Sequence, residues 1–397
     1  MLRPDTFALT ALLAILTGLG PTSVDMYLAS LPEIGRALTA TPATVQLTLS
    51  VYLVGYTIGQ IFYGPVSDHY GRRPVLLLSL IVYCLASAAC AAAPNIETLL
   101  VARGVQAIGV SGTVVLARAI VRDLYEGPRA ARELSLMASI MALAPVGAPP
   151  IGGVLQTLFG WRSNFVFMVA VGVAATVVAW RLLPETLRRA SDATISIGAI
   201  GASYRIVAAN RAFLAYLGIL AFSFGGLFAW ISGLTFVLQG LYAVTPFEFG
   251  ISFAFASLGY LTGTAIATRY VGRLGIDRTI GLGAIAQAVG GLLAVAVVAL
   301  RIPYAWPLVF AMALYVCGLG LVQPQAMAGA LAPFPDRAGA ASSLLGLGQM
   351  SFAAIIGAGV GQALGGSAWP LVLTVAVMGA LTLATWITTR ALRARKT

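Results

Sequence analysis

Charged side chains are scarce in this chain. Lysine, arginine, aspartate and glutamate together make up 9% of its 397 residues, compared with about 25% in soluble proteins. Hydrophobic residues make up 59%, and the mean hydropathy is +0.92. A water-soluble fold cannot hide that much apolar surface, so this composition excludes a soluble protein and predicts an integral membrane protein.

Histidine and cysteine are also scarce. His69 is the only histidine, so neither a histidine cluster for zinc nor a Ser-His-Asp triad is expected. Cys84 and Cys90 share one predicted helix, roughly 9 Å apart along its axis, and Cys317 falls in another, so we expect no structural disulfide. The phosphate-binding pattern GxxxxGK[ST] is absent. We therefore predict no metal, no cofactor and no use of ATP.

Long apolar segments recur along the whole chain. A helix of roughly 20 residues crosses the hydrocarbon core of a membrane, and twelve such segments are found. They lie near residues 7–31, 45–66, 75–93, 98–121, 134–158, 164–183, 213–239, 247–268, 279–300, 306–331, 340–364 and 370–390. The predicted fold class is therefore an all-α integral membrane protein with 12 transmembrane helices.

The positions of the basic residues predict the orientation of these spans. With both termini in the cytoplasm, only Arg36, Arg162 and Arg301 fall outside and Arg103 falls within a span, which leaves the other 20 of the 24 Lys and Arg residues on the cytoplasmic side. Residues 1–31 lack a cleavage site and are expected to remain as the first span. The net charge of +11 is spread over short loops, which favours contact with anionic lipids over nucleic acid.

The chain also divides into two similar halves. The longest polar connection separates six spans from six, which predicts an N-terminal bundle over 1–183, a cytoplasmic linker over 184–211 and a C-terminal bundle over 212–397. Gly71-Arg72 after the second span is echoed by Gly272-Arg273 after the eighth. Internal repeats of this kind are a known construction of secondary transporters, whose substrate site lies between the repeats.

A basic loop follows the second span, with the sequence Gly-Pro-Val-Ser-Asp-His-Tyr-Gly-Arg-Arg over residues 64–73. It resembles the loop motif of the major facilitator superfamily. The resemblance implies a latch that closes the cytoplasmic side in one conformation, in which an arginine pairs with an acid at the end of the fourth span. The residues that would form it are Gly64, Asp68, Gly71, Arg72, Arg73 and Asp123. The alternative is that these charges only mark a cytoplasmic loop.

Asp25 lies within the first apolar segment. A carboxylate in hydrocarbon costs ~2.5 kcal/mol or more, so Asp25 is expected to face protein or water. Its surroundings, Gly-Pro-Thr-Ser-Val-Asp-Met-Tyr over residues 20–27, resemble the first-span signature of the Bcr/CflA drug-resistance branch of the superfamily. A buried carboxyl group changes its proton affinity when its environment changes, so Asp25 is a candidate proton carrier. The alternative is a structural acid that caps a broken helix.

Arg103 is the predicted counterpart of Asp25. It lies six residues inside the fourth span, roughly 9 Å from the outer end, and Asp25 lies roughly 10 Å from Pro32. The sequence Arg-Gly-Val-Gln-Ala-Ile-Gly over residues 103–109 resembles the family's span-4 motif, and the resemblance implies a role in proton coupling. A purely structural arginine is the alternative.

The fifth span carries closely spaced prolines and glycines, namely Pro145, Pro149, Gly152 and Gly153. The segment resembles the family's antiport motif, although Ala144 and Ala148 replace two of its glycines. Small residues let helix backbones approach closely and prolines bend the helix. Ordinary helix packing is the alternative interpretation.

A binding cavity for varied drugs needs polarizable and aromatic walls with few polar groups. The candidate substrate-binding residues are Asp25, Tyr27, Tyr56, Met137, Met141, Phe224, Trp230, Gln349, Met350 and Phe352. Each aromatic residue among them could instead pack against lipid or a neighbouring helix.

Together these features predict a multi-pass protein of the bacterial inner membrane with the two-bundle major facilitator fold. The resemblance implies a monomeric multidrug exporter that exchanges amphipathic antibiotics, such as chloramphenicol, florfenicol or bicyclomycin, for protons by alternating access. The proton gradient would be its energy source. A proton-coupled importer of a metabolite on the same fold is the alternative. A membrane enzyme or receptor would need a polar catalytic cluster or a large extramembrane domain, and the sequence contains neither.

Overall fold

The protein is almost entirely helical. A computed structural model describes residues 7–125, 129, 133–134, 136–137, 140–187, 204–334 and 337–393, and none of these residues lies in a β-strand. The chain divides into two compact units, Met1–Ile195 and Ser196–Thr397. The boundary falls inside the predicted linker.

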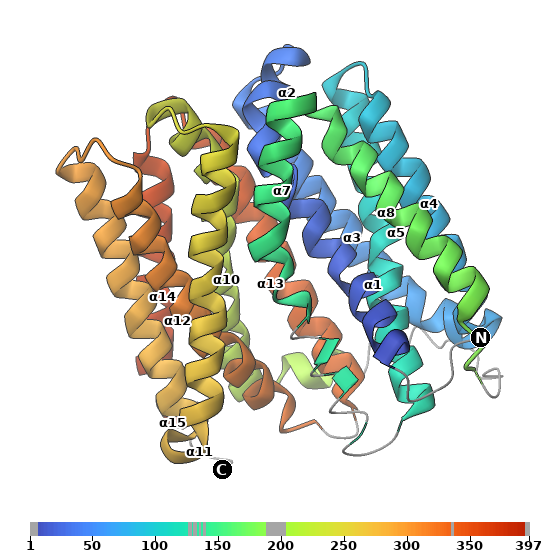
Figure 1. The fold of residues 1–397 in the computed structure, drawn as a ribbon. Coiled ribbons are helices and arrows are strands. Elements are labelled where there is room, and N and C mark those ends of the chain that lie inside the picture. The colour runs from blue at the N-terminus through green and yellow to red at the C-terminus, as the bar shows by residue number, and fades with distance from the viewer. Residues whose placement is uncertain are drawn as a thin grey trace. The chain divides into compact units, whose positions relative to one another are not determined.

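The first unit is a bundle of long helices around α5 (Figure 1). Its elements are α1 (Phe7–Asp25), a 3₁₀ turn (Leu28–Ser30), α2 (Leu31–Ala37), α3 (Pro42–Tyr70), α4 (Arg72–Ala92), α5 (Ile96–Leu124), α7 (Ala144–Phe159) and α8 (Arg162–Leu182). The helix α5 packs against α1, α3 and α4. Side chains from these four helices therefore meet in the interior of the unit.

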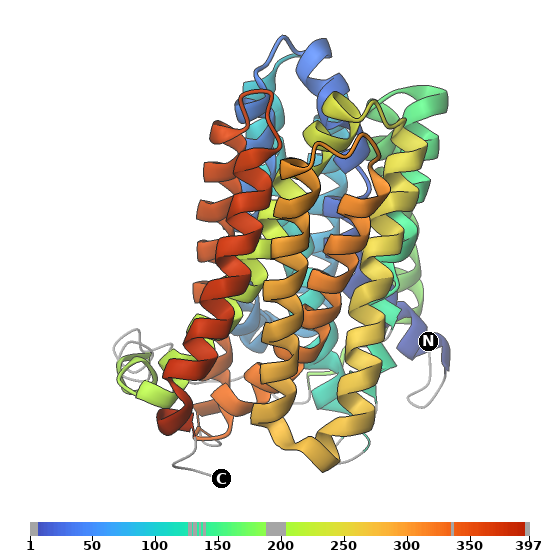
Figure 2. The same ribbon diagram turned by 90° about the vertical axis from the view of Figure 1, so that its left-hand side faces the viewer.

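The second unit contains α10 (Arg211–Thr235), a π-helical turn (Phe236–Leu241), α11 (Pro246–Ala299), α12 (Trp306–Leu331), α13 (Ala338–Ala363), α14 (Trp369–Thr388) and α15 (Arg390–Arg393). The 54 residues of α11 form two arms that meet at Gly275 (Figure 2). Gly275 has φ 77° and ψ 167°, a conformation that favours glycine because a Cβ would be strained there. The segment predicted as a loop between two spans is therefore helical except at this residue.

Ten of the described helices are long and apolar enough to cross a membrane. One of them is α11, whose two arms correspond to two predicted spans. A further predicted span, the fifth, is shortened to the 16 residues of α7. The prediction of twelve spans in an all-α membrane protein is confirmed.

The shortening of the fifth span follows from its prolines. A turn at Ala142 and Leu143 interrupts the helix, and Pro145 is the second residue of α7, which begins after this turn. Proline lacks an N–H group and its ring clashes with the carbonyl group four residues earlier, here that of Met141. The predicted continuous helix over 134–158 is therefore wrong at this point.

The internal repeat is present in the backbone, but not at the predicted residue. Gly71 has φ 100° and ψ 152° and joins α3 to α4. Gly275 has a similar conformation in the second unit, whereas Gly272 and Arg273 lie inside the first arm of α11. The residue that matches Gly71 in conformation is therefore Gly275, three residues after the predicted Gly272.

Candidate functional site

Asp25 is the last residue of α1, where the helix of the first span breaks. Pro21 cannot donate the helical hydrogen bond to the carbonyl group four residues earlier. The Met26 N–H group still bonds to the Thr22 carbonyl (3.0 Å), and a 3₁₀ turn follows. The Asp25 side chain is 5% exposed, and no hydrogen bond or ion pair reaches its carboxylate from the described residues. This buried carboxyl group has no fixed partner within that part of the chain.

Arg103 on α5 is fully buried and contacts the residues on both sides of Asp25. Its Nη1 donates to the Ser23 carbonyl oxygen (3.0 Å) and to Gln106 Oε1 (2.6 Å). The guanidinium carbon lies 4.2 Å from the ring centroid of Tyr27 and 4.3 Å from that of Tyr52, at cation–π distance. Arg103 therefore holds the backbone at the helix break without forming an ion pair with Asp25.

The contacts of Arg103 belong to a closed polar network that joins α1, α4 and α5. Ser23 Oγ and the Tyr83 hydroxyl are 2.9 Å apart. Ser87 Oγ donates to the Tyr83 carbonyl (2.7 Å) and accepts from Gln106 Nε2 (2.8 Å), which returns the network to Arg103. Sequence reasoning missed the two residues on α4, Tyr83 and Ser87, because no local pattern distinguishes them from other residues of an apolar span.

The helix break packs closely against α7. A Cβ added at Gly152 would lie 1.8 Å from the Met26 carbonyl oxygen, so only glycine fits there. Three other small residues of α7, which are Ala144, Gly147 and Ala148, line a cavity. A Cβ at Gly147 would meet no atom within 4 Å. The expectation that this motif brings backbones together therefore holds at Gly152 and is wrong at Gly147.

The second unit contains a related but uncharged network. Gln287 Nε2 donates to Ser223 Oγ (2.5 Å), and the Tyr315 hydroxyl donates to the Ser223 carbonyl (3.1 Å). In each unit a serine on the first long helix thus has both its hydroxyl and its carbonyl oxygen bonded by neighbouring helices. Tyr315 supplies to Ser223 the contact that Arg103 supplies to Ser23, without a charge.

The predicted ion pair of the cytoplasmic latch is present. Arg72 Nε lies 2.9 Å from Asp123 Oδ2, and its Nη1 lies 2.5 Å from Asp68 Oδ1 and donates to Ser67 Oγ (2.6 Å). Gly71 forms the turn before Arg72, and Gly64 has no close neighbour at its Cβ position. The role of these residues as a conformational latch stays a prediction.

Glu185, which directly follows the sixth span, was not predicted as part of this site. Its carboxylate accepts hydrogen bonds from the backbone N–H groups of Arg72 (2.9 Å) and Arg73 (3.1 Å), and from those of Thr186 and Leu187. The first N–H groups of a helix have no partner within the helix, and a negative charge is favourable there. Partial burial raises the pKa of Glu185, but these four N–H donors outweigh it and hold the pKa below its usual value. Glu185 therefore caps α4.

Replacing Glu185 by alanine is expected to destabilise the protein by about 1 to 2 kcal/mol, the usual cost of losing a helix cap. The glutamine variant retains one acceptor oxygen and should lose less stability than the alanine variant. Because the pKa of the native carboxyl lies below its ordinary value of 4.5, the stabilisation is complete above that pH and is lost as pH falls below it. Thermal unfolding in detergent at several pH values measures this, and an equal difference from the wild type at all pH values would contradict it.

A corresponding contact in the second unit has its charges exchanged. Asp277 lies two residues after Gly275, and its Oδ1 is 2.8 Å from Arg393 Nη2. Arg393 Nη2 also donates to the Trp386 carbonyl (2.6 Å). In the first unit Arg73 Nη2 donates to the Trp180 carbonyl (2.5 Å). The helix after Gly71 and the helix arm after Gly275 are thus each tied to the end of the last long helix of their unit. The acid follows the last long helix in the first unit and follows the glycine in the second. Sequence reasoning missed Asp277 and Arg393, which lie 116 residues apart.

The predicted binding residues of the first unit differ in accessibility. Tyr27 is fully buried, with its ring on Arg103 and its hydroxyl 2.9 Å from Thr48 Oγ1, so its polar atom is already bonded. Tyr56 is half-buried next to Tyr52. The two methionines of this set are Met137, which is buried, and Met141, which is half-buried.

The second unit holds the remaining predicted binding residues, which are Phe224, Trp230, Gln349, Met350 and Phe352. Trp230 is 2% exposed, and its indole N–H has no hydrogen-bond partner among the described residues. Phe352 packs edge-on against Phe222, with ring centroids 5.5 Å apart. Gln349 is buried, and the other two are half-buried. Their role in binding stays a prediction.

Comparison with known proteins identifies the family. Residues 13–358 match the model of the Major Facilitator Superfamily. An uncharacterized MFS-type transporter, YdgK of Bacillus subtilis, is 35% identical over 90% of this chain and 89% of its own length. The bicyclomycin resistance protein homolog of Haemophilus influenzae is 30% identical over 94% of both chains. The xylose transporter XylE from E. coli shares the fold, with a TM-score of 0.72 and 14% identity over 97% of this chain and 98% of its own. The chain therefore belongs to the major facilitator superfamily, in the Bcr/CflA-like group that its motifs predicted.

Proposed function

We propose that this protein is a proton-coupled multidrug exporter of the bacterial inner membrane, with both termini in the cytoplasm. It exchanges amphipathic antibiotics for protons by alternating access and uses the proton gradient as its energy source. Membership of a transporter superfamily supports transport in general. The name of the Haemophilus relative, a bicyclomycin resistance protein homolog, supports drug export in particular.

The observation that carries the proposal is the position of Asp25. A carboxyl group within a membrane span is costly and is normally paired or functional. Asp25 is buried at a helix break and has no partner among the described residues. A structural cap would be expected to hold hydrogen bonds, as Glu185 does on α4. An unpaired carboxyl group is suited to gain and lose a proton.

Arg103 acts as a positioning residue in this mechanism. Its bond to the Ser23 carbonyl and its stacking on Tyr27 fix the chain on either side of Asp25. Its charge, buried in the same unit, favours the ionised carboxylate when the two groups approach. Drug binding and protonation of Asp25 must then disfavour each other, because exchange requires a reciprocal coupling free energy.

Phenicols such as chloramphenicol and florfenicol, together with bicyclomycin, are the proposed substrates. They combine apolar surface with hydrogen-bonding groups, as a cavity with few polar contacts requires. An importer that moves a metabolite together with protons is the second candidate, since fold alone does not fix direction.

Everted membrane vesicles that carry a pH-sensitive dye test the proposal. Once respiration has acidified the vesicles, addition of chloramphenicol, florfenicol or bicyclomycin should release protons and restore the dye signal in vesicles that contain the protein. Vesicles without the protein are the control. No response to any of the three drugs, together with uptake of a metabolite that dissipates the gradient, would support the importer instead.

A further inference from the structure

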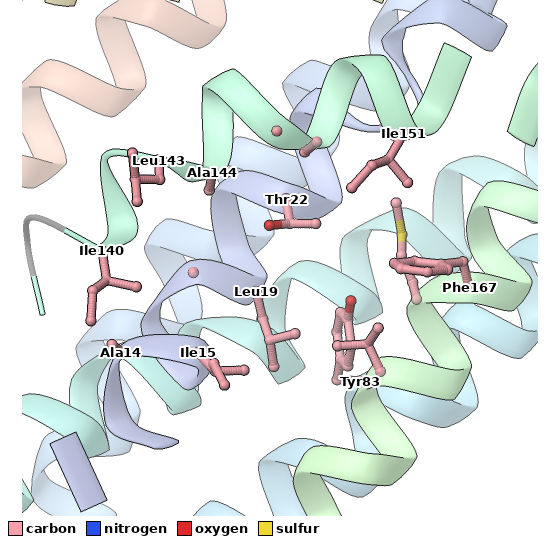
Figure 3. Close-up of a pocket in the computed structure, with 15 residues that line it drawn as sticks. Ala14, Ile15, Leu19, Thr22, Tyr83, Ile140, Leu143, Ala144, Ile151 and Phe167 are labelled. Carbon is pink, nitrogen blue, oxygen red and sulfur yellow. The ribbon is translucent and has the colours of Figure 1, made fainter. Parts of the chain in front are cut away.

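A cavity of about 300 Å³ lies within the first unit, between α1, α4, α7 and α8. Figure 3 shows its walls, which include Leu19 and Thr22 from α1, Tyr83 from α4 and Ile151 from α7. Its lining is almost wholly apolar. The proposed drug–proton exchange assigns no role to this cavity.

Two glycines keep the cavity open. Gly18 on α1 and Gly147 on α7 both line it, and a Cβ added at either would meet no atom within 4 Å. Next to them, Ala14 and Ala144 also present only a methyl group. The close contact of α7 with Met26 lies at Gly152, one residue beyond the end of the lining at Ile151. The two helices therefore separate along the cavity and close at its end.

The cavity opens on an exposed apolar surface of the first unit. Residues at its rim are exposed, with Ile15 at 51%, Leu143 at 56% and Ile151 at 46%. Residues at its floor are buried, with Leu19 at 3% and Met168 at 1%. The rim is thus exposed apolar surface on a unit whose helices α1 and α8 are long and apolar enough to cross a membrane, and the floor lies behind it.

Water is a poor occupant of this cavity. A buried water needs two to four polar partners, and the hydroxyl of Tyr83 is already bonded to Ser23. Apolar cavities of about 150 Å³ take up hydrocarbon ligands instead. Hydrocarbon chains are available at the rim throughout the bilayer, so the void would be filled from there.

We propose that the cavity is a binding site for one acyl chain of a membrane phospholipid. Its lining on α1 runs from Ala14 to Thr22, roughly 12 Å along the helix axis. This length and the apolar lining suit an extended aliphatic chain. The acyl chain would lie against Tyr83, which bonds to Ser23 two residues before Asp25, and so would support the helix break.

Photo-crosslinking tests this in lipid nanodiscs that contain the full-length protein and phosphatidylethanolamine with a diazirine in its acyl chain. Rim residues should be labelled whether or not a chain enters, because they are exposed on the surface of the unit. Labelling of the floor residues Leu19 and Met168, mapped by mass spectrometry, requires a chain inside the cavity. Gly18→Leu and Gly147→Leu should each lower floor labelling at least fivefold and leave rim labelling unchanged.

Gly359→Leu on α13 is the matched control, because its Cβ position is equally free of neighbours but lies in the other unit. It should label like the wild type. Floor residues that remain unlabelled in the wild type, or labelling that persists in both filled variants, would overturn the proposal. Displacement of the floor label by chloramphenicol would also overturn it, by identifying the occupant as a drug. None of these readouts depends on transport, so the proposed exchange can fail without affecting this result.

Discussion

Replacing Asp25 by asparagine is expected to abolish the release of protons when a drug is added to acidified vesicles. Asparagine has nearly the same size but cannot exchange a proton at any physiological pH. Because the described residues form no hydrogen bond or ion pair with the Asp25 carboxylate, its replacement breaks no such contact. The variant should therefore be produced at the wild-type level and unfold at a similar temperature.

Glu97→Gln provides the matched control for Asp25→Asn. Glu97 is an exposed acid in the first turn of α5 and lies on the same helix as Arg103. Its variant should retain the full dye response. Drug-driven proton release that persists in Asp25→Asn would assign proton transfer to another group, and a folding defect in that variant would indicate a structural acid instead.

Replacing Gly152 by alanine is expected to destabilise the first unit by about 3 kcal/mol or more, the upper end of the usual cost of overpacking. The added methyl group would lie 1.8 Å from the Met26 carbonyl oxygen, which is backbone and cannot rotate away. Either α7 or the helix break must move. Because Met26 adjoins Asp25, transport should fall together with stability.

Gly147→Ala is the matched control for Gly152→Ala, since it adds the same methyl group to the same helix at a position with no atom within 4 Å. Its melting temperature should equal that of the wild type or lie slightly above it, because alanine has a higher helix propensity than glycine. Thermal unfolding in detergent compares the two variants. Equal melting temperatures would mean that the contact at Gly152 does not limit the packing of the helix break.

Both variants act at one place, the end of α1, but on different properties. Asp25→Asn removes a titratable group and leaves the packing intact. Gly152→Ala leaves every titratable group in place and displaces the backbone that holds one of them. We expect both variants to lose proton coupling and only Gly152→Ala to lose stability. That result would show that the titratable group and the packing that positions it are separate requirements.

The sequence by itself determined the membrane class, the number of spans and the family. A membrane span must satisfy its backbone hydrogen bonds internally, so about 20 apolar residues specify a helix almost without reference to the rest of the chain. Asp25 and Arg103 were found for the same reason, because a charge stands out against an apolar background. Arg72 was found through a motif that is contiguous in the chain, and Asp123 through its place at the end of the fourth span.

Only the tertiary structure decided which groups meet. Tyr83 and Ser87 join Arg103 through contacts between different helices, and Glu185 reaches the start of α4 across 113 residues. Small residues in the fifth span predicted close packing, yet Gly152 touches backbone while Gly147 faces a cavity. The local sequence does not distinguish the two positions, because neither glycine has a side chain. What lies opposite each of them depends on the tilt of the neighbouring helix, which is set by the packing of the whole bundle.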